Sequence, residues 1–574
     1  MLSCRHTPNC VPHEMLETEL NVPLPIDEVA RRAGLPPDSL SPYGRYKAKL
    51  DHTLGAGARK GKARYVLVTA ITPTPAGEGK TVTTIGLSMA LNRIGRAAVS
   101  TIRQPSMGPV FGVKGGGAGG GASQVVPLEE INLHLTGDFH AVAAANNLLA
   151  AALDTSLLLD NPLGLEPERV TWRRVVDMND RALRQVQIGL GGAQNGVPRN
   201  TGFDITAASE VMSVIGLARS RADLRARLER IVIGEKRGGG FATAGELGVA
   251  GAMAAILRDA LDPTLMQTSE GTPALVHAGP FANISFGNSS VLGDALALRY
   301  FDYVVTEAGF GADMGAEKLL NIKCRVSGRS PDVAVLVATV RGLKAHSGRF
   351  ELKAGAPLPP ELLREDLEAL ELGASNLAAQ IQNVRLHGIP VVVAVNRFPS
   401  DSERELARLA ALARAFGAEA CALSELFARG GEGGVELAQA VVDVAERNLA
   451  RYRPAYPLEQ SIEDKIHTLA TGLYGAAGVE YTPRASAEIR RFQELGFGGL
   501  PICMAKTQYS LSHDPRLKGA PKGYTFPIRE VRLQAGGGFL VPMAGDIQSM
   551  PGLGRSPAYR GIDLDPDGHV TGLT

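Results

Sequence analysis

A glycine-containing loop between a strand pattern and a helical pattern constrains the fold of this chain more than any other feature. Residues 65–71 form a continuous apolar run of strand length, and residues 97–102 form another. Between them, the loop at 74–81 precedes a stretch whose apolar residues recur on one helical face. The order strand, loop, helix, strand predicts a βαβ unit. Because the strands lack polar alternation, we expect a parallel sheet buried on both faces.

The loop has the composition of a nucleotide phosphate site. Its glycines let successive N–H groups point at phosphate oxygens, and the following helix N-terminus adds partial positive charge. Lys80 is placed to reach the β- and γ-phosphates, and the Thr81 hydroxyl to ligate Mg²⁺. Thr74 stands where the GxxxxGK[ST] pattern has glycine, so a βα turn that binds nothing is the alternative. The predicted nucleotide-binding residues are Thr74, Pro75, Ala76, Gly77, Glu78, Gly79, Lys80 and Thr81.

A second cationic feature follows the strand at 97–102. Arg103 stands at its expected carboxyl end, where ligands bind in open parallel sheets, and its planar fork suits a phosphate or acyl phosphate. Seven of the ten residues from Gly112 to Gly121 are glycine, which lets the backbone approach a ligand closely at an entropic cost. Lys114, inside this glycine track, is a candidate for a second phosphate contact. A flexible loop with a surface arginine is the alternative.

The rest of the chain repeats the α/β pattern. We predict an α/β protein with a phosphate-loop NTPase-like, mostly parallel sheet domain, a second α/β domain and a small mixed α+β C-terminal domain. In the last of these, two short strand patterns predict an antiparallel hairpin. The expected boundaries are a leader at 1–25 and domains at 26–355, 356–480 and 481–574, with a Pro/Gly-rich seam at 354–360. Further apolar runs lie at 302–306, 333–339 and 389–395, helical patterns at 402–416, 435–450 and 483–495, and the hairpin strands at 528–534 and 539–543.

Charge and cysteine usage limit the partners of the chain. Lys+Arg 60 against Asp+Glu 59 leaves a net charge of +1, so we expect no nucleic acid and no membrane surface as partner. The five cysteines form no CxxC pair, which argues against a disulfide framework. No segment offers 18 uninterrupted apolar residues, and no signal-peptide pattern begins the chain. We therefore expect a cytoplasmic location.

The motifs together resemble the formate–tetrahydrofolate ligase (formyltetrahydrofolate synthetase) family. The resemblance extends from about residue 25 to residue 574 and includes several blocks in the family's order. Besides the phosphate loop and residues 103–121, these blocks are 136–140, 277–283, 306–313, 337–344, 505–510 and 550–553.

This resemblance implies a chemistry and a set of roles. The family ligates formate to tetrahydrofolate (EC 6.3.4.3) with ATP and Mg²⁺, through formyl phosphate, giving 10-formyltetrahydrofolate, ADP and phosphate. It implies catalytic roles for Lys80 and Arg103, with Arg103 binding the intermediate. It places the folate ring between Phe398 and Phe427, for which core packing is the alternative. A monovalent cation activator and a homotetramer are also implied.

Several positions depart from the family pattern, among them residues in the blocks at 116–118 and 341–348 and four single residues. Gln104 replaces a glutamate, Ala122 a tyrosine, Phe286 a histidine, and Phe427 a tryptophan. Two other hypotheses therefore stay open. One is a different carboxylate-activating synthetase with a changed acceptor. The other is a non-catalytic nucleotide-binding assembly protein.

Further candidates are polar residues of the shared blocks. The spacing of His134, Asp138 and His140 permits a metal site, although a hydrogen-bonded loop is the commoner arrangement. Glu307 and Asp313 flank a Gly-Phe-Gly turn and are candidates for substrate or cation contacts. For His277 we expect a hydrogen-bonded core histidine.

Overall fold

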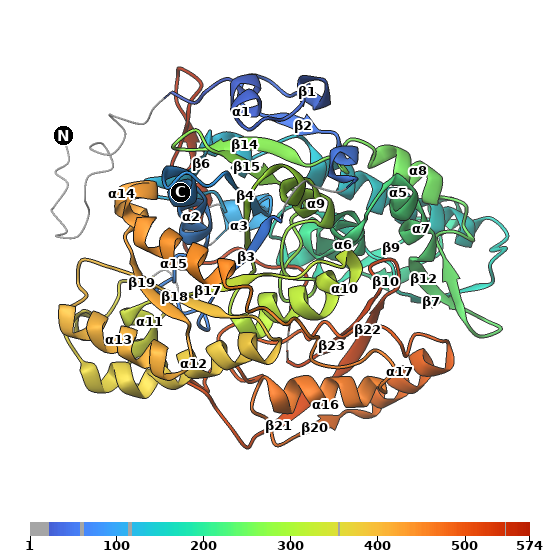
Figure 1. The fold of residues 1–574 in the computed structure, drawn as a ribbon. Coiled ribbons are helices and arrows are strands. Elements are labelled where there is room, and N and C mark those ends of the chain that lie inside the picture. The colour runs from blue at the N-terminus through green and yellow to red at the C-terminus, as the bar shows by residue number, and fades with distance from the viewer. Residues whose placement is uncertain (1–21, 58–61, 113–116, 354–355, 546, 574) are drawn as a thin grey trace, which may run out of the picture.

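One large, mainly parallel sheet forms the centre of the molecule (Figure 1). The computed structural model describes residues 22–57, 62–112, 117–353, 356–545 and 547–573. The strand order is β1-β2-β14-β15-β4-β16-β3-β17-β18-β19. Strands from β15 along this order to β19 run parallel, whereas β1, β2, β14 and β15 pair antiparallel. Their bounds are Leu40–Pro42 (β1), Ala48–Leu50 (β2), Thr264–Thr268 (β14), Pro273–Val276 (β15), Ala98–Ile102 (β4), Tyr303–Glu307 (β16), Arg64–Ala70 (β3), Val333–Ala338 (β17), Val391–Asn396 (β18) and Ala420–Ser424 (β19).

Helices cover both faces of this sheet. Val66 of β3 packs in a core cluster with residues of α2 and α15, and its neighbour Leu67 packs on the opposite face with residues of α12 and α13. Successive strand residues point to opposite faces, so a strand buried on both sides needs apolar residues throughout. The buried parallel sheet predicted from the continuous apolar runs is therefore confirmed. The covering helices are α2 (Lys80–Arg93), α15 (Val435–Glu446), α12 (Leu367–Leu386) and α13 (Glu403–Ala415).

The predicted βαβ unit is present as β3, α2 and β4. Residues 356–480, expected as a second α/β domain, contribute β18 and β19 to the same sheet. The antiparallel hairpin is present as β22 (Glu530–Gln534) and β23 (Phe539–Met543). Near the expected seam, residues 354 and 355 lie outside the described residues. The domain boundaries themselves stay a prediction.

The C-terminal elements share a separate core cluster. Ile466 of α16, Phe492 of α17, Phe526 of β21 and Leu540 of β23 are buried in it. In Figure 1, α16 and α17 lie together at the lower edge of the view, below the main sheet. The bounds are α16 Ile462–Gly472, α17 Pro483–Glu494, β20 Gly478–Tyr481 and β21 Thr525–Ile528.

Helix α5 (Asp138–Leu158) is long and apolar enough, by length and composition alone, to cross a membrane. Its residues Leu149 and Leu153 are buried in a core cluster with Trp172 and Met212, as in the core helix of a globular domain.

The other helices are α1 (Ile26–Arg32), α3 (Met107–Phe111), α4 (Leu128–Asn132), α6 (Glu210–Leu217), α7 (Arg221–Arg230), α8 (Ala250–Ile256), α9 (Val291–Tyr300), α10 (Cys324–Ser327), α11 (Val340–His346) and α14 (Leu426–Arg429). The remaining strands are β5 (Gly119–Gly120), β6 (Ser123–Val126), β7 (Leu165–Val170), β8 (Arg174–Val176), β9 (Val186–Ile188), β10 (Arg199–Thr201), β11 (Phe203–Ile205), β12 (Val232–Lys236), β13 (Phe241–Thr243), β24 (Asp563–Leu564) and β25 (Val570–Thr571).

A buried polar segment follows β16 and was not expected from the sequence. Its two π-helical turns span Ala312–Ala316 and Leu319–Lys323. Within it, Glu317 is buried, with Oε1 accepting from Asn321 Nδ2 at 2.8 Å and Oε2 lacking a hydrogen-bond partner in the described part of the chain. Burial raises the pKa of Glu317 to about 7, against the opposing charge of Lys318.

This pKa predicts a pH-dependent stability. Since the folded-state pKa lies above the unfolded value, the contribution of Glu317 to stability is full below about pH 4.5 and is lost as pH rises to about 7. Between pH 5 and pH 8, the wild type should lose about 2 kcal/mol more unfolding free energy than Glu317→Gln. Urea unfolding at both pH values checks this, with exposed Glu436→Gln as the matched control. Equal losses in the wild type and Glu317→Gln would contradict the assignment.

Candidate active site

Three neighbouring strands bring the predicted catalytic residues together at their carboxyl ends. The strands β4, β16 and β3 lie side by side and end at Arg103, at Glu307 and at the phosphate loop. The Thr81 hydroxyl donates to Glu307 Oε2, and Arg103 Nη2 lies 3.4 Å from Glu307 Oε1. The loop and the guanidinium, which are more than twenty residues apart, therefore contact the same carboxylate.

The phosphate loop is closed by its own side chains. Glu78 is buried and accepts from the Thr74 N–H at 2.8 Å and from the Thr74 hydroxyl at 2.9 Å. The Thr74 hydroxyl in turn accepts from the Ala76 N–H at 3.2 Å. Glycine at position 74 would keep the N–H bond but lose both bonds of the hydroxyl, so the departure from the GxxxxGK[ST] pattern has a structural use here. Burial raises the pKa of Glu78, and the charge of Lys80 opposes the shift.

The turn into α2 needs glycine. Gly79 has φ +81°, and a Cβ added there would collide with Asn396 Nδ2. That amide donates to the carbonyl oxygen of Glu78 at 3.0 Å. Asn396 at the end of β18 therefore holds the loop from the side, and Lys80 begins α2 directly after it. Asn396 was not among the site residues predicted from the sequence.

Arg341, also missed from the sequence, joins the phosphate loop to Phe398. Its Nη2 donates to the carbonyl oxygens of Ala76 and Gly77 at 2.6 and 3.2 Å. Its guanidinium carbon lies 3.4 Å from the centroid of the Phe398 ring, and burial lowers its pKa. Arg341 follows β17 as Arg103 follows β4, and this position after a predicted parallel strand was the available signal.

Phe427 lies against the end of the glycine track. Its side chain is 55% exposed, and its carbonyl oxygen accepts from the Ala122 N–H at 2.8 Å. A Cβ on Gly121 would lie 2.9 Å from Phe427 Cγ, so this approach requires glycine. Phe398 and Phe427 both follow strand ends, those of β18 and β19. Lys114 lies outside the described residues.

Known proteins with similar sequences identify the family of this chain. Residues 16–574 match the family model described as Formate--tetrahydrofolate ligase. The chain belongs to this family. A Formate--tetrahydrofolate ligase of Roseiflexus sp. (strain RS-1) is 57% identical over 551 residues, covering 96% of this chain and 98% of that protein. Those of Chloroflexus aurantiacus (strain ATCC 29366 / DSM 635 / J-10-fl) and Rubrobacter xylanophilus (Formate--tetrahydrofolate ligase 3) are 56% and 55% identical, each covering 96% of this chain and 97% and 98% of the relative.

Departures from the family pattern occupy different environments. Phe286 is fully buried in a core cluster with Leu217 and Phe539. Gln104 is buried beside Arg103, and its N–H donates to the carbonyl oxygen of Ala278 at 2.8 Å. The Ala122 N–H donates to the carbonyl oxygen of Phe427, a residue proposed for the folate site.

Several candidate residues have structural partners. Asp313 is buried in an ion pair with Lys506 at 2.5 Å, so its carboxylate points into the core. His277 is a hydrogen-bonded core histidine, as predicted, with its ring nitrogens 2.6 Å from Ser290 Oγ and 2.8 Å from the carbonyl oxygen of Ala260. Burial lowers the pKa of His277 to about 4.

His134, Asp138 and His140 have the hydrogen-bonded arrangement that the sequence favoured over a metal site. Asp138 begins α5 and pairs with Lys49 at 2.7 Å, whereas His134 lies in the preceding turn and contacts His140 at 2.9 Å. A helix face shared by His134 and Asp138 therefore does not form. Among the described residues, one other group has ligand atoms close enough for an ion, namely Asp51, His52 and Asp262.

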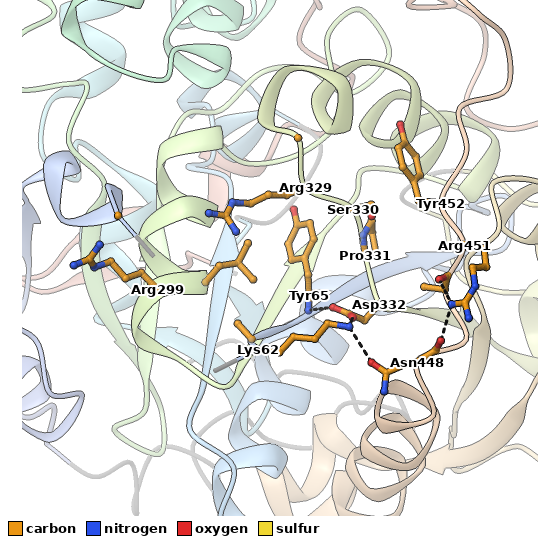
Figure 2. A pocket seen from close by; sticks show the side chains of 15 residues that line it. Lys62, Tyr65, Arg299, Arg329, Ser330, Pro331, Asp332, Asn448, Arg451 and Tyr452 are labelled. Atoms are coloured by element: carbon orange, nitrogen blue, oxygen red, sulfur yellow. Dashed lines mark hydrogen bonds and ion pairs between the residues drawn. The ribbon is translucent and has the colours of Figure 1, made fainter. Parts of the chain in front are cut away.

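A cavity of about 530 Å³ lies at the opposite, amino edge of the sheet (Figure 2). There Asp332 accepts from Lys62 Nζ and from the Tyr65 N–H, both at 2.9 Å. Asn448 Oδ1 also accepts from Lys62 at 2.9 Å. These contacts tie the start of β3 to the segment after α15, and none of the predicted site residues lines this cavity.

Proposed function

We propose that this chain ligates formate to tetrahydrofolate with ATP, through formyl phosphate, giving 10-formyltetrahydrofolate, ADP and phosphate. Membership of the ligase family supports the overall reaction. The observation that carries the assignment of roles is the carboxylate of Glu307, which contacts both Thr81 of the phosphate loop and Arg103. A phosphoryl donor held by the loop would therefore lie beside the guanidinium.

The first half-reaction is a phosphoryl transfer. A formate oxygen attacks the γ-phosphorus, the bond to the bridging oxygen breaks, and ADP leaves. Such a transfer needs positioning and charge stabilisation, which Lys80 and the loop N–H groups supply. The Thr81 hydroxyl and the Glu307 carboxylate are oxygen donors of the type that Mg²⁺ prefers, and they lie in contact. When bound there, Mg²⁺ would neutralise phosphate charge.

Acyl transfer is the second half-reaction. N10 of tetrahydrofolate attacks the formyl carbon, the carbon–oxygen bond to phosphate breaks, and N10 releases its proton. Arg103 is positioned for the departing phosphate, since Nη1 donates to the carbonyl oxygen of Pro280 at 3.1 Å and its buried Nε lacks a partner in the described structure. A Cβ at Gly309 would collide with Ala282 Cβ and lie 3.0 Å from Arg103 Nη2, so a side chain there would crowd the guanidinium.

Phe398 and Phe427 are proposed to flank the folate ring, with Lys114 as a further phosphate contact. Flat ligands of mixed polarity are commonly held by aromatic side chains. We also retain, as proposals from the sequence patterns, a phosphate-loop NTPase-like fold with the domain boundaries given above and a cytoplasmic location. Monovalent-cation activation and a homotetramer are retained as proposals from the resemblance.

Assaying the purified chain with formate, acetate or bicarbonate tests this function. We expect ADP release and 10-formyltetrahydrofolate absorbance only with formate and tetrahydrofolate together. A signal with acetate or bicarbonate would favour a different carboxylate-activating synthetase. ATP binding without any product would favour a nucleotide-binding assembly protein.

Arg341 is predicted to affect the binding of both ATP and tetrahydrofolate. Arg341→Gln removes charge-assisted bonds to the loop and the contact with Phe398, so the KM values of both ATP and tetrahydrofolate should rise about tenfold. Phe398→Leu should raise only the KM of tetrahydrofolate. Steady-state kinetics with each substrate varied measure both, and Arg408→Gln, a half-exposed arginine of α13, serves as the control. A change confined to one substrate in Arg341→Gln would show that the residue does not connect the two sites.

A further inference from the structure

A second open cavity, of about 690 Å³, is lined by arginines. It lies where residues 173–185 meet the C-terminal elements α17, β22 and β23. None of the residues proposed for catalysis or for folate binding lines it. Six of its fifteen lining residues are arginine, namely Arg173, Arg181, Arg184, Arg484, Arg529 and Arg532.

Among the described lining residues of this cavity, arginines outnumber acidic residues. Glu530 is its one acidic residue among the described lining residues, and it is shared by Arg484 and Arg532, each at 2.6 Å. Arg173 pairs with Asp204 at 2.8 Å. Arg484 has a second carboxylate partner, Glu488, at 2.9 Å. Guanidinium groups remain charged at every physiological pH, so the arginines of the cavity without a carboxylate partner favour a bound anion.

Two of these arginines are bound by neutral groups. Arg184 Nε donates to the carbonyl oxygen of Met550 at 2.9 Å, and Arg181 Nη2 donates to that of Leu553. Carbonyl oxygens orient a guanidinium without neutralising it. In the described part of the chain, neither arginine has a carboxylate partner.

The segment that orients them is the block at 550–553, to which the proposed reaction gives no role. A Cβ at Gly552 would collide with Arg181 Nε, so glycine is needed for the guanidinium to lie across this segment. Met550 is buried, and its sulfur accepts from the Asp180 N–H at 3.5 Å. The block therefore fixes the position of two charged forks at the cavity wall.

We propose that this cavity binds an anion of two or more linked phosphate groups. Planar guanidinium forks match phosphate oxygens bidentately, and several of them converge here. The volume lies in the range of small-molecule sites and exceeds what a single phosphate fills. The described lining residues include no aromatic side chain on which a nucleotide base could stack, which favours a phosphate-dense ligand over a nucleotide.

Calorimetric titration of the full chain with inorganic tripolyphosphate tests this proposal. Saturating Mg²⁺-ADP is included to occupy the phosphate loop. We expect one saturable site, weakened about tenfold or more by Arg181→Gln and by Arg184→Gln. Arg181 is exposed, so its replacement should leave the thermal unfolding temperature unchanged. The matched control is Arg225→Gln on α7, which is 63% exposed, pairs with Glu229 and lies outside the cavity.

The outcomes separate this site from the phosphate loop. Tripolyphosphate binding that is lost in Lys80→Ala but kept in both cavity variants would place the anion at the loop and overturn the proposal. If Arg225→Gln weakened tripolyphosphate binding as much as the cavity variants do, the binding would reflect general charge attraction, and the proposed site would be overturned. A parallel titration with citrate tests whether a carboxylate anion binds the same cavity. An affinity for citrate equal to that for tripolyphosphate would overturn the phosphate assignment. None of these results depends on ligase activity.

Discussion

Replacing Arg103 with alanine is expected to lower kcat/KM for formate-dependent ADP release by about 10³-fold, with the fold intact. The guanidinium is placed where charge develops on the transferring groups, and removal of one such donor typically lowers rate by 10²–10³. Loss of the contact to Glu307 also leaves that carboxylate, held by Thr81, without its positive neighbour. Coupled ADP release measured beside the thermal unfolding temperature gives both quantities.

Lys80→Ala should be equally inactive for a different reason. The lysine belongs to the phosphate loop, so its loss should weaken ATP binding, which Arg103→Ala should retain. Calorimetric titration with a non-hydrolysable ATP analogue separates the two variants. Arg408→Gln, exposed on α13 and paired with Glu371, is the matched arginine control. Near-normal turnover in either alanine variant would show that the roles are assigned wrongly.

Local patterns of the sequence predicted the parallel sheet well. The runs at 65–71, 97–102 and 333–339 became β3, β4 and β17 because a strand covered by helices on both faces must be apolar throughout. Antiparallel β14 and β15 were missed, since β14 has the sequence TLMQT, whose three polar residues interrupt the apolar run by which the other buried strands were identified. The buried π-helical segment after β16 was also missed, because it contains lysines and carboxylates, residue types that are usually exposed to solvent.

The site depends on strand order, which no local pattern contains. Glu307 reaches Thr81 and Arg103 because β16 lies between β3 and β4, although about 200 residues of chain separate it from both. For the same reason the Arg341 contact with Phe398 could not be predicted from either segment alone. Position after a strand end does identify candidates, but only the sheet order decides which of them meet.

One departure from the family pattern illustrates a similar dependence. Phe286 fills space over Gly216, where an added Cβ would lie 2.8 Å from the ring Cε1. The ring is accommodated because position 216 on α6, 70 positions away in the chain, has no side chain. Considered by itself, the departure at position 286 suggests a weakened site, whereas the contacts place the ring in a core cluster.

Asp313→Asn is expected to lower the free energy of unfolding by about 3–4 kcal/mol at pH 7.5. The variant leaves Lys506, which is fully buried, without its carboxylate, and breaking one partner of a buried pair typically has this effect. Lys506 still donates to the carbonyl oxygen of Ser510 at 2.7 Å, which holds the loss toward the lower end of the range. Chemical denaturation measures it.

Deprotonation of Lys506 sets an upper limit on that loss and gives it a characteristic pH dependence. A buried lysine without a carboxylate partner can instead lose its proton. The free-energy cost of this deprotonation is about 1.4 kcal/mol for each pH unit below the ordinary pKa of lysine. Burial already lowers the pKa of Lys506 in the intact pair. The penalty of Asp313→Asn should therefore fall to about 2 kcal/mol at pH 9, and Lys506→Met in the same chain should remove most of the pH dependence. A loss that stayed constant from pH 7.5 to 9 would mean that the lysine charge is not what destabilises the variant.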